Sequence, residues 1–100
     1  MIWTPEQVDG QTCWRLALNF NNPILSTLVL VAAHRPEWGG WCVTAGNGST
    51  REIVETLRQP HDGTPPFMVR VPEGATAEQA KAAGDEWAAY FEGLTRPVVK

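Results

Sequence analysis

The clearest pattern of hydrophobic and polar positions lies between Thr76 and Gly93. Small or apolar residues recur there three or four positions apart, at Ala80, Ala83, Gly84, Trp87, Phe91 and Leu94. This spacing places them on one face of an α-helix. Thr76 and Gln79 have the form of a capping box, in which each side chain satisfies an unpaired backbone amide. Because Gly93 suits a left-handed stop, the pattern predicts a helix over residues 77–92.

The side chains on the predicted buried face of this helix are small in its first half and large in its second half. Gly84 lowers the stability of a helix by about 1 kcal/mol relative to Ala, so its position predicts close contact with a neighbouring element. Residues 77–92 would span about 24 Å, roughly the width of a five-stranded sheet. The helix is therefore expected to lie across a sheet.

Alternating apolar and polar positions before this helix predict the strands. Residues 12–20 place Trp14, Leu16, Leu18 and Phe20 on one face and Cys13, Arg15, Ala17 and Asn19 on the other. This alternation is typical of a half-buried strand. Residues 41–46 and 67–71 are also predicted to be strands. Asp9-Gly10 is a hairpin-turn pair, so residues 1–7 form either an edge strand or a loose arm.

Residues 24–34 are apolar on both faces, which is typical of a central strand that is covered on both sides. The C-terminal helix supplies one cover. A second copy of the chain is one explanation for the other, and it predicts a homodimer through the second face of the sheet. A short strand that bends over itself is the alternative.

Residues 49–58 fit two different structures. Asn47-Gly48 is a strong hairpin signal, and it predicts a strand with Cys42 opposite Ile53. The alternative is a helix, because Ser49 and Glu52 form a capping box and the apolar residues that follow share one helical face. The strand is favoured, and the helix stays open.

These elements predict an α+β fold in one domain over residues 1–100. It consists of an antiparallel sheet of four to five strands with one C-terminal helix packed across one face. With 43% hydrophobic and 19% charged residues, the composition is that of an ordinary globular protein. No apolar run is long enough to cross a membrane, and the first residues lack the basic-then-apolar pattern of a signal peptide, so a cytoplasmic location is expected. Cys13 and Cys42 are expected to stay reduced.

The charge is concentrated on the C-terminal helix. The net charge of the chain is −3, which argues against direct nucleic-acid binding. The helix carries Glu78, Asp85, Glu86 and Glu92 against Lys81 alone. Lys81 is expected to pair with Asp85 four positions on. The remaining acidic face either attracts a basic partner or is an ordinary solvated helix face.

No motif for catalysis, a cofactor or a metal is present, so the chain is expected not to be an enzyme. His34, Arg35 and Glu37 lie at one turn and form either a small polar site or a solvated strand end. Trp38 lies beside them. Tryptophan is enriched in protein interfaces, so Trp38 is a candidate contact, and the alternative is that it folds back onto the sheet.

The arrangement resembles the small single-domain α+β proteins carried by phages and prophages, a size class that includes many anti-CRISPR proteins. The resemblance rests on the Gly39-Gly40-Trp41 strand entry, the Asn47-Gly48 hairpin signal and the helix that opens Thr76-Ala77-Glu78-Gln79. It implies a phage-encoded inhibitor that acts in the host cytoplasm. No functional residue follows from the resemblance.

The leading functional hypothesis is a non-catalytic protein that occupies a surface of another protein, plausibly a basic surface of a host complex. The candidate contact residues are Trp38, Glu37, Arg35, Glu78, Asp85, Glu86 and Glu92. One alternative is a self-associating structural or assembly component of a phage or mobile element. A second is a small enzyme or ligand-binding domain around His34, Arg35 and Glu37.

Overall fold

The computed structural model describes residues 2–18, 28–36, 39–58, 68–72 and 74–95. Within these residues the chain forms an antiparallel sheet of five strands whose order in space, β1-β2-β3-β4-β5, is the order in the sequence. The strands are β1 (Thr4–Val8), β2 (Gln11–Ala17), β3 (Val29–Arg35), β4 (Gly40–Gly46) and β5 (Met68–Arg70). The predicted α+β class is confirmed.

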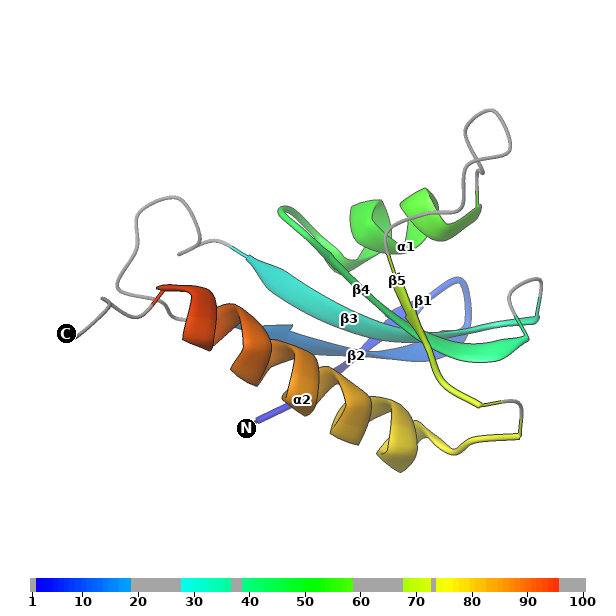
Figure 1. Cartoon of the computed structure of the whole chain (residues 1–100). Helices are drawn as coiled ribbons and strands as arrows, with labels where there is room; N and C mark the ends of the chain where they lie inside the picture. Colours follow the sequence, from blue (N-terminus) through cyan, green and yellow to red (C-terminus); the bar gives the residue numbers. More distant parts are fainter. Residues whose placement is uncertain (1, 19–27, 37–38, 59–67, 73, 96–100) are drawn as a thin grey trace, which may run out of the picture.

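Two helices lie on opposite faces of this sheet (Figure 1). Helix α2 (Ala77–Thr95) covers the face that carries Leu16, Leu30, Ala32 and Val43. Helix α1 (Thr50–Arg58) covers the other face, which carries Cys13, Val31, Ala33 and Cys42. The apolar surface of β3 is therefore buried on both sides, and Leu30, Val31 and Ala32 are 0% exposed.

The start of α2 is as predicted. The Thr76 amide donates a hydrogen bond to Oε1 of Gln79 at 2.8 Å, and the Gln79 amide donates to Oγ1 of Thr76 at 3.3 Å. The end differs from the prediction, because Gly93 lies inside the helix, which continues to Thr95. The predicted close contact at Gly84 is confirmed: a Cβ atom added there would lie 2.5 Å from two ring carbons of Trp3.

The first two strands form a hairpin, so the choice between an edge strand and a loose arm is settled in favour of the strand. Val8 pairs with Gln11 across a two-residue turn. Asp9 and Gly10 have φ angles of 51° and 80°, and positive φ at both positions is what a type I′ turn requires. Strand β1 is thereby fixed as one edge of the sheet.

The favoured strand at residues 49–58 is wrong, and the alternative helix is confirmed. Ser49 caps α1: its Oγ accepts a hydrogen bond from the Glu52 amide at 3.2 Å and donates to Oε1 of Glu52 at 3.1 Å. Cys42 pairs with Ala33 and Arg70, not with Ile53. A helix places the three apolar residues of this segment on one face, whereas a strand would divide them between two faces.

Helix α1 also supplies the second cover that a partner subunit was expected to provide. Ile53, Val54 and Leu57 are 3%, 2% and 0% exposed and pack against the face of the sheet opposite α2. The reason for expecting a homodimer through that face is therefore removed. The loop predicted at residues 59–66 lies outside the described residues, and β5 confirms a shorter version of the strand predicted at 67–71.

Candidate functional site

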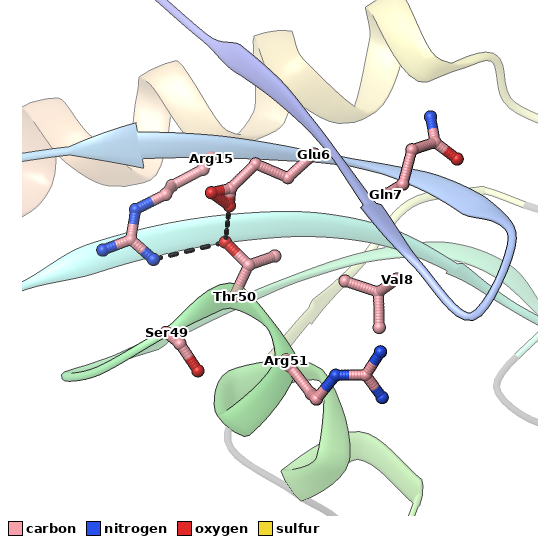
Figure 2. Close-up of a pocket in the computed structure, with 7 residues that line it drawn as sticks. All are labelled: Glu6, Gln7, Val8, Arg15, Ser49, Thr50 and Arg51. Atoms are coloured by element: carbon pink, nitrogen blue, oxygen red, sulfur yellow. Dashed lines mark hydrogen bonds between the residues drawn. The ribbon is translucent and has the colours of Figure 1, made fainter.

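The largest cavity described lies where the β1–β2 hairpin meets the start of α1. Its volume is about 570 Å³. It is lined by Glu6, Gln7, Val8, Arg15, Ser49, Thr50 and Arg51. Figure 2 shows the side chains of Glu6 and Arg15 converging on Thr50 from the two strands of the hairpin.

Thr50 is the centre of this cavity's polar network. Its side chain is almost fully buried, at 4% exposure. Its Oγ1 accepts a hydrogen bond from Nη1 of Arg15 at 3.2 Å and donates one to Oε2 of Glu6. The same Arg15 nitrogen donates to the Gly48 carbonyl at 3.0 Å. Nη1 of Arg51 lies 3.0 Å from Oδ1 of Asp9 in the hairpin turn.

Through these hydrogen bonds, the polar side chains of the cavity connect β1, β2 and α1. Arg15 joins β2 to the start of α1, and Glu6 joins β1 to the same residue of α1. Sequence reasoning missed this network, because it placed Thr50 in a strand. The signal that was available is Arg15, a charged residue on a strand face that is otherwise small or apolar.

Replacing Thr50 by Val is expected to lower the free energy of unfolding by about 1–2 kcal/mol, because Glu6 and Arg15 each lose a partner that nothing replaces. Urea denaturation measures the change. Thr12→Val is the matched control, since Thr12 is exposed and accepts its hydrogen bond from Gln7 at the surface. It is expected to change stability by less than about 0.5 kcal/mol. Equal losses in the two variants would contradict a stabilising role for the network.

The outward side of α2 is the second candidate site, and we call it the outer face of α2. It consists of Glu78, Gln79, Ala82, Glu86, Ala89 and Tyr90, all of which are exposed. Tyr90 is 62% exposed, although a side chain of that size usually buries part of its ring. Of the acidic contact candidates, Glu78 and Glu86 lie on this face.

The predicted pairing of Lys81 with Asp85 is wrong. Nζ of Lys81 lies 2.7 Å from Oε1 of Glu78 and 3.9 Å from the centre of the Trp14 ring. Asp85 instead accepts a hydrogen bond from Nε1 of Trp3 at 2.9 Å. Asp85 is half-buried, so it contributes less to the outer acidic surface than expected. The side chain of Glu92 lies outside the described residues.

The candidates around the β3–β4 turn are only partly described. His34 is exposed and meets Trp41 edge-on, with ring centres 5.7 Å apart. Arg35 is half-buried and pairs with Gly40 in the strand ladder. Glu37 and Trp38 lie outside the described residues. The predicted site is therefore described only at His34 and Arg35, and its arrangement with Glu37 stays a prediction.

Cys13 and Cys42 are both buried free thiols. Cys42 is paired with Ala33, and the β2–β3 register places Cys13 on the other side of Ala33. Two strand spacings separate their backbones by about 10 Å, which is beyond the reach of a disulfide. In the described part of the chain, no three His, Cys, Asp or Glu side chains gather as metal ligands would.

Neither helix is both long and apolar enough to cross a membrane, as far as the described residues extend. Comparison of the chain with protein-family models, curated proteins and solved structures finds no match in any of the three.

Proposed function

We propose that this protein is a non-catalytic binding protein that docks the outer face of α2 on a basic surface of another protein. The observation that carries the proposal is Tyr90, which is 62% exposed on a face that also presents Glu78 and Glu86. Tyrosine is among the residues that contribute most to binding in protein interfaces. Carboxylates around such an anchor favour a basic partner and speed its association.

The spacing of the residues on the outer face of α2 supports a role in docking. Glu78, Ala82, Glu86 and Tyr90 follow one another at intervals of four residues, so they form a single ridge along the helix. Ala82 is small and exposed. A partner is thereby able to approach the helix backbone closely between the two carboxylates, while Tyr90 fills a pocket on the partner.

The finer proposal is that the partner belongs to a host complex and that the protein is a phage-encoded inhibitor. Its support is the resemblance in size and arrangement to small phage-borne α+β proteins. Action in the host cytoplasm belongs to the same proposal.

The proposal is tested with the intact protein immobilised as bait for a lysate of a bacterial host. Captured proteins are identified by mass spectrometry, and the leading one is purified for calorimetry at low and high salt. We expect a basic protein whose affinity falls as salt rises. The double variant Glu78→Gln, Glu86→Gln is expected to weaken binding at least ~tenfold at low salt, and Tyr90→Ala at least ~tenfold at any salt.

The matched control is the double variant Gln11→Lys, Thr12→Lys. It makes the same change in net charge at two exposed positions at the start of β2, in the hairpin with β1. This control is expected to bind almost as the unchanged protein does. If capture survives both α2 changes, or if the control loses as much affinity, the outer face of α2 is not the docking surface.

The two alternative functions have less support. Self-association through the second sheet face loses its surface, since α1 packs there. For the site around His34 and Arg35, its further members Glu37 and Trp38 lie outside the described residues.

A further inference from the structure

A depression of about 360 Å³ lies at the margin of the outer face of α2, between the helix and the start of the chain. It is lined by Trp3, Glu78, Lys81, Ala82 and Asp85. Two of these residues, Glu78 and Ala82, also belong to the outer face of α2. A partner docked on that face would therefore reach the depression.

The chain already holds one cation at this place. Nζ of Lys81 contacts Oε1 of Glu78 at 2.7 Å and lies 3.9 Å above the centre of the Trp14 ring. The Lys81 side chain is only 16% exposed, whereas that of Glu78 is 81% exposed. Lys81 is thus held beneath the surface, and most of the Glu78 carboxylate remains open to solvent.

The opposite wall of the depression is an indole fixed by a carboxylate. Nε1 of Trp3 donates to Oδ1 of Asp85 at 2.9 Å, and the outer edge of the ring rests against Gly84. The ring is half-buried and cannot turn without breaking these contacts. An aromatic face attracts cations, and the negative charge of Asp85 beside the ring adds to that attraction.

The charges of the depression do not cancel. Two carboxylates, Glu78 and Asp85, stand against the single ammonium of Lys81, so one negative charge is left. A second cation would neutralise it. A guanidinium suits the space better than an ammonium, because it is flat, weakly hydrated, stacks on aromatic rings and presents two parallel donors to a carboxylate.

We propose that this depression receives an arginine side chain of the basic partner, with the guanidinium between the Trp3 ring and the Glu78 carboxylate. The proposal rests on the proposed function, since the arginine belongs to the protein that docks on α2. It assigns Trp3 and Glu78 as the residues that select arginine at the margin of that interface.

The test uses a single arginine, so that it does not depend on the partner. Nα-acetyl-arginine methylamide is titrated into the isotope-labelled full chain at constant ionic strength, and the indole N–H signals are followed by NMR. The Trp3 signal, one of five from the tryptophans, is assigned by its loss in Trp3→Phe. We expect a saturable shift of this signal with a dissociation constant of about 1–10 mM, in the range of a weak single-group contact.

Nα-acetyl-citrulline methylamide is the matched ligand control, because it has nearly the same shape and no charge. It is expected to bind at least ~fivefold more weakly. Glu78→Gln is expected to weaken binding of the arginine compound at least ~threefold. Glu86→Gln removes an equal charge about two turns further along the helix, at a residue that does not line the depression, and is expected to leave binding of the arginine compound unchanged.

No shift of the Trp3 signal, an equal response to the citrulline compound, or an equal loss in Glu78→Gln and Glu86→Gln would overturn the arginine site. Failure of the arginine site can be distinguished from failure of the proposed function. If the basic partner still binds through Glu86 and Tyr90, the outer face of α2 stands without the arginine site. If the arginine compound binds but no partner requires the outer face of α2, the depression binds arginine without being part of the proposed interface.

Discussion

Replacing Leu57 by Ala is expected to lower the free energy of unfolding by about 3 kcal/mol. Leu57 is 0% exposed and packs with Ile53 and Val54 between α1 and the sheet. Removing its side chain deletes buried apolar contacts and leaves a cavity that the surrounding strands fill only in part. Urea denaturation followed by tryptophan fluorescence measures the loss.

Thr56→Ala is the control for Leu57, because the neighbouring side chain is exposed and its hydrogen bond goes to the Ile53 carbonyl of the same helix. It is expected to change stability by less than about 0.5 kcal/mol. A loss below about 1 kcal/mol in Leu57→Ala would mean that α1 does not bury this residue against the sheet, and that the second face is covered in another way.

The second large effect is expected at the contact between Trp3 and Gly84. Trp3→Ala is expected to cost about 2 kcal/mol, because it removes a half-buried ring and the hydrogen bond to Asp85. Gly84→Ala is expected to stabilise the helix by about 1 kcal/mol, because alanine has the higher helix propensity. Its new methyl group would lie 2.5 Å from two carbons of the Trp3 ring, so the ring must leave its place.

A double-mutant cycle separates these two terms. In the Gly84→Ala background, Trp3→Ala is expected to cost less than about 0.5 kcal/mol, because the ring no longer occupies its site. Ala89→Gly serves as the control, since Ala89 is exposed. It loses helix propensity without touching Trp3, so the cost of Trp3→Ala should stay near its original value. Additive losses in the Trp3–Gly84 cycle would show that the two residues do not depend on each other.

Much of the fold follows from the periodicity of the sequence. The helix that begins at residue 77 and the strand over residues 11–17 were predictable because their apolar residues fit one period and no other. The edge strand was predictable from the Asp9-Gly10 turn. The last turn of α2 was not, because Gly93 is able to continue a helix at a modest cost as well as to end one.

Residues 49–58 show why a local sequence pattern does not always determine the secondary structure. Ile53 and Val54 favour strands by their branching, and their spacing with Leu57 also fits one face of a helix. The second face of β3 decides between the two, since it is apolar and needs a cover. Because the cover by α1 was not favoured, a second copy of the chain was one explanation for the apolar second face of β3.

The side-chain contacts of the candidate sites were the least predictable part. Lys81 has one carboxylate three positions before it, Glu78, and one four positions after it, Asp85, and the sequence does not choose between them. Asp85 accepts a hydrogen bond from Trp3, which lies 82 positions earlier in the chain. A contact between such distant residues leaves no periodic trace in the sequence.

Helix α2 follows all five strands of the sheet in the sequence, so it leaves the ribosome after them. The strands are hydrogen-bonded in the order in which they are synthesised, so a nascent chain is able to form the sheet progressively. Until α2 emerges, Leu30, Ala32 and Val43 face water on the side that α2 later covers. A chain truncated before residue 77 is therefore expected to require a chaperone or to aggregate.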